Sequence, residues 1–165
     1  MTQEEKQILF KNLCAMLPYD VIVEYGCKHE GKDLGERKSK LTGRMIDSFF
    51  GNITIGMSEV YSLQPYLRPM ESMTEEEMGE YAKFKLSYDD VYEFTDFRAT
   101  GKGFINVNTS CKNGGVGYTF QVNNRTMLYD GVIGIDWLNA HHFDFRGLIE
   151  KGLALSAPEG MYKTD

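Results

Sequence analysis

The stretch GFINVNTSCKNGGVGYTFQVNN, residues 103–124, decides the fold class of this chain. Asn113-Gly114 near its centre is a dipeptide that readily supplies the positive φ angles of a tight turn. On both sides of this turn apolar and polar residues alternate, as they do in strands that bury one face. The apolar positions are Ile105, Val107, Tyr118, Phe120 and Val122. The pattern predicts an antiparallel hairpin that turns at Asn113-Gly114.

More strands are expected on either side of this hairpin. The preceding DVYEFTDFRAT, residues 90–100, is rich in aromatic and other β-favouring residues. Asn123-Asn124 and Asp130-Gly131 add turn signals downstream. We therefore expect a meander of short antiparallel strands, with a β-rich, insertion-like section at about 98–134.

Helices are expected at the start and at the centre of the chain. Thr2 is followed three residues later by a glutamate, the spacing of a capping box, and Pro18 should end the helix that begins there. Ser72 and Thr74 each have a glutamate three residues on, and Glu75 to Glu77 favour the positive end of a helix dipole. A central helix should therefore begin near Thr74.

The segment between these helices is predicted to be mostly extended. DVIVEYGCK, residues 20–28, alternates and indicates a strand. The polar segment that follows it, up to residue 44, is expected to be a solvated turn region. GRMIDSFFGNITIGM, residues 43–57, indicates two short strands joined at Gly51-Asn52. SLQPYLRPMESM, residues 62–73, contains two prolines and is expected to be a stiff connector.

The last section is predicted to be helical again. Asp136 is the expected N-cap of WLNAHH, and Asp144 the expected N-cap of FRGLIEK, with Gly152 at the C′ position. Together these elements predict an α+β fold: an antiparallel sheet of short strands and hairpins, with N-terminal, central and C-terminal helices packed on one face. The 165 residues fit a single domain spanning 1–165.

Composition narrows the classes of function. The formal net charge is −6 and the pI is about 5.1, which argues against nucleic acid as a partner. The start of the chain is acidic and has no signal-peptide pattern, and no apolar run approaches the roughly 20 residues of a membrane span. We therefore expect a soluble, cytoplasmic protein with no membrane partner. No cysteine pair has metal-ligand spacing and no motif implies a cofactor.

Basic residues gather in the segment 28–44 although the chain is acidic overall. They are Lys28, Lys32, Arg37, Lys38, Lys40 and Arg44. A solvated, exposed segment is one interpretation, and a patch that binds an anionic ligand is the other. Aromatic residues of the sheet could complete such a ligand site, or face a partner protein, and Tyr118 is the candidate among them.

The stretch WLNAHHFDFRG, residues 137–147, holds the only tryptophan and two of the three histidines. Adjacent histidines on a helix point about 100° apart and do not easily share one metal ion. We interpret the stretch as structural, with Trp137 and Phe143 as core anchors and Asp144 as a cap. The alternative is a metal-dependent hydrolase that uses His141 and Asp144. We predict no catalytic or metal-binding residue under the structural interpretation.

Two segments, QPYLRPMESMTEEE (64–77) and WLNAHHFDFRGLIEKGLAL (137–155), resemble segments of small proteins encoded by gut Bacteroidales and by their phages or integrated elements. The resemblance covers about a fifth of the chain. It implies an accessory protein of a phage or mobile element, and it implies no activity, cofactor or catalytic residue.

Three functions are compatible with the sequence. The first is a non-enzymatic protein-binding module that acts on a host or phage protein, for example as an inhibitor of a host factor. The second is a small-ligand binder that sequesters an anionic nucleotide through the basic segment 28–44. The third is the hydrolase centred on His141 and Asp144. The sequence leaves the partner and the oligomeric state open.

Overall fold

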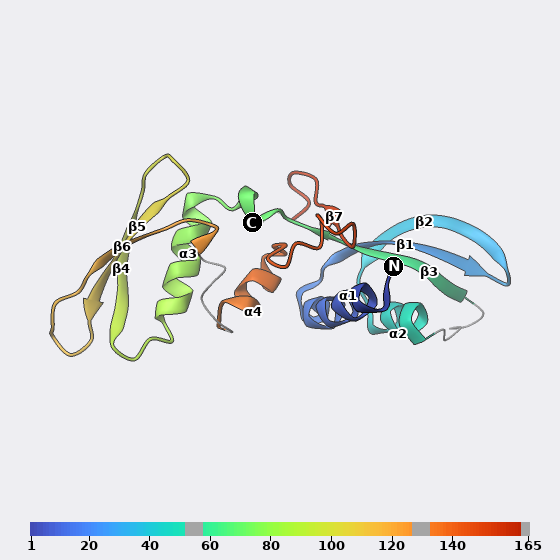
Figure 1. The fold of residues 1–165 in the computed structure, drawn as a ribbon, viewed down its shortest axis with the longest axis horizontal. Coiled ribbons are helices and arrows are strands. Elements are labelled where there is room, and N and C mark those ends of the chain that lie inside the picture. Colours follow the sequence, from blue (N-terminus) through green and yellow to red (C-terminus); the bar gives the residue numbers. More distant parts are fainter. Residues whose placement is uncertain (52–57, 127–132, 163–165) are drawn as a thin grey trace. The chain divides into compact units, whose positions relative to one another are not determined.

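The computed structural model describes residues 1–51, 58–126 and 133–162, and it confirms an α+β fold. The described residues form two compact units (Figure 1). Unit 1 consists of residues 1–68 and 139–165, and unit 2 of residues 69–138. The sequence suggested one domain with a β-rich section at about 98–134. That section lies inside unit 2, which begins near residue 69.

Unit 1 contains a four-stranded sheet with the strand order β2-β1-β3-β7. Its strands are β1 (Ile22–His29), β2 (Lys32–Lys40), β3 (Ser58–Leu67) and β7 (Leu155–Ser156). Neighbouring strands are antiparallel except β3 and β7, which are parallel. The sheet is therefore mixed, because the short C-terminal strand joins it in the direction of β3.

Two helices pack on this sheet and close the core of unit 1 (Figure 1). They are α1 (Gln3–Met16), followed by the 3₁₀ turn η1 (Leu17–Tyr19), and α2 (Gly43–Gly51). The predicted capping box of Thr2 and Glu5 is confirmed, and the α-helix ends just before Pro18. The core contains Leu9, Leu13, Met16, Val21, Val23, Ile46, Leu63, Leu67, Leu148 and Leu153.

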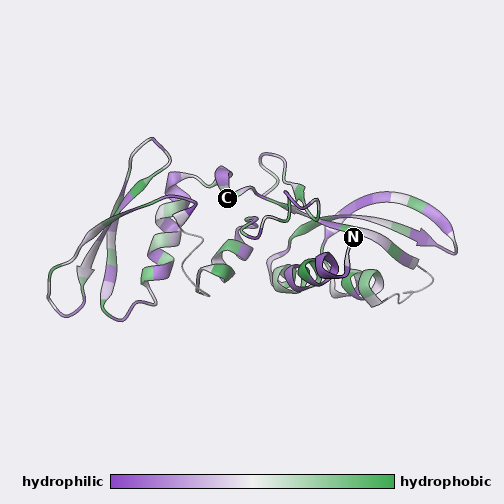
Figure 2. Cartoon of the chain, in the orientation of Figure 1, coloured by the Kyte–Doolittle hydropathy of each residue, from purple (hydrophilic) through white to green (hydrophobic). Residues whose placement is uncertain are grey.

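The prediction of a turn region after residue 28 was wrong, because residues 32–40 form strand β2. Glu30 and Gly31, with φ angles of 50° and 79°, make the tight turn between β1 and β2. The strand lies at the edge of the sheet and is hydrophilic along most of its length (Figure 2). Backbone pairing with β1 stabilises β2, so apolar side chains are not required.

The hairpin predicted at Gly51-Asn52 was also wrong in its first half, since residues 43–51 form the helix α2. Met45, Ile46, Phe49 and Phe50 recur at the spacing of a helix face, and they pack on the core of unit 1. The second half of that prediction lies outside the described residues. Residues 62–67 belong to β3 and are not a connector. In the part of the chain that the structure describes, β7 pairs with Tyr66 and Leu67 and leaves the edge of β3 open beside Pro65, where a strand tolerates proline.

Unit 2 contains a three-stranded antiparallel sheet covered on one face by a helix. The strands are β4 (Tyr92–Ala99), β5 (Ile105–Cys111) and β6 (Thr119–Val122), in that order. The 3₁₀ turn η2 (Met70–Ser72) precedes the helix α3 (Glu75–Leu86), which packs against β4 and β5. The predicted hairpin of β5 and β6 is confirmed: Gly114 has a φ of 77°, and its N–H donates to the carbonyl of Cys111.

The central capping box is confirmed at Thr74, whose hydroxyl accepts from the N–H of Glu77 while the Glu77 carboxylate accepts from the N–H of Thr74. Ser72 does not start the helix, because it lies in η2 and its hydroxyl donates to the carbonyl of Pro69. Gly79 lets α3 approach β4, since a Cβ at this position would lie 2.3 Å from the ring of Phe97.

The C-terminal section differs from the expectation of two capped helices. α4 comprises Ile133–Ala140, so Asp136 lies in its first turn and is not its N-cap. In place of the helix expected after Asp144, residues 145–153 form successive turns and bends. Both Asp144 carboxylate oxygens nevertheless accept backbone N–H groups, from Leu148 and Ile149, each at 2.8 Å. The Asp144 side chain therefore caps a turn that is too short to be a helix.

The expected anchors Trp137 and Phe143 are both buried, but they belong to different units. In unit 2 the Trp137 ring meets the ring of Tyr81 edge-on, with the ring centroids 5.2 Å apart. In unit 1 Phe143 is fully buried below the guanidinium of Arg68, which lies 4.3 Å from the ring centroid. Trp137 is therefore a buried anchor of unit 2, and Phe143 is a buried anchor of unit 1.

Candidate functional site

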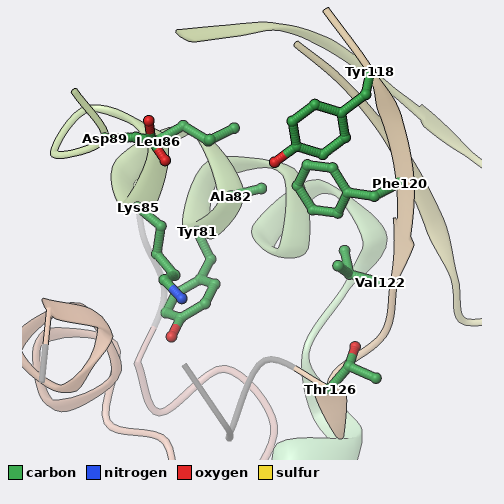
Figure 3. Close-up of a pocket in the computed structure, with 9 residues that line it drawn as sticks. All are labelled: Tyr81, Ala82, Lys85, Leu86, Asp89, Tyr118, Phe120, Val122 and Thr126. Atoms are coloured by element: carbon green, nitrogen blue, oxygen red, sulfur yellow. The ribbon is translucent and has the colours of Figure 1, made fainter. Parts of the chain in front are cut away.

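A cavity lies in unit 2, between α3 and the edge strand β6. It has a volume of about 400 Å³. Figure 3 shows the Tyr118 and Phe120 rings on one side and the α3 side chains on the other. The lining residues are Tyr81, Ala82, Lys85, Leu86, Asp89, Tyr118, Phe120, Val122 and Thr126. The cavity therefore combines an aromatic wall with a few polar groups, which is the usual character of a binding site.

The helical wall follows from the spacing of residues in α3. Tyr81 and Ala82 lie one turn before Lys85 and Leu86, so the four side chains share the same side of the helix. Tyr81 is held from behind by α4, where a Cβ on Gly134 would lie 1.8 Å from its hydroxyl oxygen. The wall on this side is thus fixed by helix packing.

The sheet wall follows from the two-residue period of β6 and the residue before it. Tyr118, Phe120 and Val122 alternate, so all three face the cavity while Thr119 and Gln121 face the opposite side. Tyr118 is fixed by Thr109, whose N–H and hydroxyl both donate to its carbonyl, at 3.0 and 2.8 Å. The three side chains of this wall are therefore placed by the backbone of β6 and its bonds to β5.

Aromatic contacts make this wall continuous. The rings of Tyr92 and Tyr118 meet at right angles with centroids 4.7 Å apart, and the ring of Phe120 lies 5.4 Å from that of Tyr118. Tyr118 is 45% exposed in spite of these contacts. α3 packs on β4 and β5, so the cavity lies where the helix does not cover the end of the sheet.

A carboxylate marks one end of the cavity. One Asp89 oxygen accepts the N–H groups of Val91 and Tyr92, each at 2.8 Å. These hydrogen bonds, that of Tyr92 first, hold the pKa of the Asp89 carboxyl below its ordinary value. Asp89 is therefore ionised at neutral pH, and Lys85 also lines the cavity.

The backbone of β6 adds a second feature next to the cavity. Because Thr109 donates to Tyr118, these two form a hydrogen-bonded pair, and bonded pairs alternate along an antiparallel ladder. The N–H and C=O groups of Thr119 and Gln121 therefore point away from β5. Among the described residues β6 is the end strand of its sheet, so these groups face an open edge.

The basic residues predicted as an anion site are spread along unit 1 and do not converge. Lys28 lies on β1, Arg44 lies in the first turn of α2, and the other four lie on β2. Lys28 lies over the ring of Tyr61, and Lys40 is bonded to Asp20 at 2.7 Å. Lys38 lies 3.7 Å from Glu24 and over the ring of Tyr66. Lys32 and Arg37 project from the same exposed strand.

Tyr118, the aromatic candidate, lines the cavity of unit 2 and lies in a different unit from the basic residues. Sequence reasoning missed Lys85, Leu86 and Asp89 as its neighbours. Two patterns in the sequence correspond to the walls of the cavity: the alternating residues of β6, and the residues on one side of α3. Spacing alone could not show that these two elements face each other.

The proposed hydrolase pair is not supported by its contacts. His141 lines a cavity in unit 1 whose lining does not include Asp144. The Asp144 carboxylate is buried, and each of its oxygens accepts a backbone N–H. Within the described residues no three His, Cys, Asp or Glu side chains are grouped as a metal site would require.

Comparisons with protein families, curated proteins and solved structures found no match. Across residues 1–51, 58–126 and 133–162, no helix combines the length and the apolar character that a membrane crossing requires. The function must therefore be argued from the geometry of the two units.

Proposed function

We propose that this protein is a non-enzymatic protein-binding module, and that unit 2 takes up an extended segment of its partner as an added strand beside β6. The observation that carries the proposal is the open backbone edge of β6 next to an aromatic cavity. In strand addition the main-chain bonds supply affinity, and pockets for alternate side chains supply specificity.

The edges of the other strands are less suited to this role. β2 carries lysine, arginine and acidic side chains along its length, and β4 contains Glu93, Asp96, Arg98 and a bulge at Thr95. Charged side chains and bulges are the usual means by which proteins prevent pairing at an edge. β6 has no charged residue. Its side chains on the exposed face are already bonded to β5, through Thr119 to Asn108 and Gln121 to Asn106.

Charge indicates the kind of segment that would bind. Unit 2 contains 11 acidic and 6 basic residues, a formal charge of −5, whereas the whole chain carries −6. An acidic surface favours association with a positively charged partner. We infer an extended segment that alternates apolar residues, facing the cavity, with lysine or arginine. The resemblance to phage and Bacteroidales proteins makes a host or phage protein the first partner to test, with inhibition of a host factor as the effect.

The test uses an array of eight-residue peptides that alternate apolar residues with lysine, followed by fluorescence anisotropy on the peptides that bind. Gln121→Pro removes an outward N–H from the edge. The variant keeps the backbone bonds to β5 and loses only the side-chain bond to Asn106 on that strand. Gln121→Pro and Phe120→Ala should each weaken binding about tenfold or more. Tyr88→Ala is the control, because Tyr88 is 60% exposed and does not line the cavity. Unchanged affinity of Gln121→Pro would show that strand addition is wrong.

A further inference from the structure

A second cavity, in unit 1, gathers basic side chains from three parts of the chain. Its volume is about 260 Å³. The lining residues are Asp20, Ile22, Lys40, Arg68, Ala140, His141, His142, Met161 and Tyr162. Lys40 ends β2, Arg68 follows β3, and His141 follows α4. The fold therefore brings together basic groups that are far apart in the sequence.

The two cations are held in place by different contacts. Arg68 lies over the ring of Phe143, and its backbone accepts from Asp144 and donates to His142, both at 2.8 Å. A guanidinium fixed in this way loses little conformational freedom when it binds an anion. Lys40 is paired with Asp20 at 2.7 Å, and 65% of its side chain is exposed, so it can turn toward a ligand.

A rigid neutral wall faces these cations. The rings of His142 and Tyr162 are stacked, with centroids 3.7 Å apart and planes within 7°. The Nε2 of His142 is bonded to the carbonyl of Tyr19 at 2.7 Å. The Tyr162 hydroxyl accepts from the N–H of Ile22 and donates to the carbonyl of Tyr66. These polar groups are satisfied within the protein, so the wall supplies shape to the site.

The wall also carries no charge at neutral pH. Burial lowers the pKa of His142 and raises the pKa of Tyr162 to about 12. The charges of His141 and Arg68 lower the pKa of His142 further, and the charge of Asp20 opposes them. Among the described residues that line the cavity, Lys40 and Arg68 are cations and Asp20 is a carboxylate.

We propose that this cavity binds a small organic anion through a carboxylate or phosphate group, with Lys40 and Arg68 as its charge partners. Arginine and lysine are the side chains that proteins use for both groups, and bonds between charged partners are the stronger ones. The volume lies below the roughly 300–1,000 Å³ of pockets for drug-sized ligands, which favours a ligand smaller than a nucleotide. The site is independent of β6, because it lies wholly in unit 1.

The experiment is isothermal titration calorimetry of the full chain with inorganic phosphate and with citrate, at constant ionic strength set by sodium chloride. Lys40→Met should weaken binding about tenfold, since it removes a bond between charged groups. Arg68→Gln should do the same, and circular dichroism verifies that it is folded. Lys32→Met is the matched control, because Lys32 lies on the same strand and outside the cavity.

Binding of phosphate alone identifies a phosphate site, and binding of citrate alone a carboxylate site. Either result, lost in Lys40→Met and kept in Lys32→Met, supports the proposal. The proposal is overturned if neither anion releases or absorbs heat above the chloride control. It is equally overturned if Lys40→Met and folded Arg68→Gln bind as tightly as the natural chain.

Discussion

At the residue scale, Gly117 fixes the aromatic wall of the cavity in unit 2. A Cβ at this position would lie 1.8 Å from the carbonyl oxygen of Thr109, which is a backbone atom that cannot move by a side-chain rotation. We expect Gly117→Ala to lower the free energy of unfolding by about 1–3 kcal/mol, measured by urea unfolding. Gly115→Ala is the control, because its Cβ would meet only the Cys111 side chain, at 3.2 Å. Equal effects of the two changes would contradict this role of Gly117.

His142 links the stability of unit 1 to pH. Burial lowers its pKa in the folded state, so the unfolded chain binds the proton more readily. The stabilisation is complete above the ordinary histidine pKa of about 6.5 and is lost as the pH falls through the lowered value. Urea unfolding at neutral and mildly acidic pH should therefore show a larger loss for the natural chain than for His142→Asn. Asparagine tolerates the φ of 61° at this position.

The neighbouring histidine provides the control for this pH effect. His141→Asn leaves the buried imidazole of His142 in place and should therefore reduce the pH dependence less than His142→Asn does. Carboxylates that titrate in the same range are common to all three proteins, so their contribution cancels in the comparison. If His142→Asn loses as much stability on acidification as the natural chain, the assignment to His142 is wrong.

At the scale of elements, Asp144 stabilises the turns between α4 and β7. Its two carboxylate oxygens accept the N–H groups of Leu148 and Ile149, and Gly152 follows with a φ of 67°. We expect Asp144→Ala to cost about 1–2 kcal/mol of unfolding free energy, as the loss of a strong cap does. Asp136→Ala should cost less, because Asp136 lies within α4 and is not its cap. Chemical denaturation of both variants measures the difference, and a larger effect at Asp136 would contradict it.

Elements with a local cause were predictable from the sequence. The capping boxes at Thr2 and Thr74 and the turn at Gly114 each depend on residues within four positions of one another. β2 and β3 were missed because partners elsewhere in the chain determine them. The polar residues 32–40 form a strand only because β1 offers its edge. For residues 43–51 the choice lay between the two-residue period of a strand and the 3.6-residue period of a helix. The four apolar residues there occur in adjacent pairs, which fits a helix better than a strand.

In the candidate sites, too, features with a local cause were predictable and features that depend on distant segments were not. Tyr118 could be singled out because it is an aromatic residue in a strand with polar neighbours. Its cavity could not be predicted, because the opposite wall comes from α3, more than thirty residues earlier. Lys40 was part of a basic cluster in the sequence, but its neighbours Arg68 and His141 come from distant segments. Spacing along a chain reports neighbours within one element, whereas a site joins several.

At the scale of the whole molecule, each unit has a buried core of its own, and the only tryptophan lies in unit 2. Fluorescence of Trp137 should therefore report the unfolding of unit 2, while far-UV circular dichroism reports both units. Leu13 is fully buried in the core of unit 1, and Leu13→Ala should destabilise that unit by about 2–5 kcal/mol.

In Leu13→Ala, the circular dichroism transition should begin at lower urea while the fluorescence midpoint stays near that of the natural chain. Ile105→Ala is the matched change in unit 2, since Ile105 is equally buried there and should move the fluorescence midpoint instead. The reason is that a core substitution acts on the cooperative unit that contains it. If both probes shift together in both variants, the two units unfold as one, and the free energy of each core is shared by the whole chain.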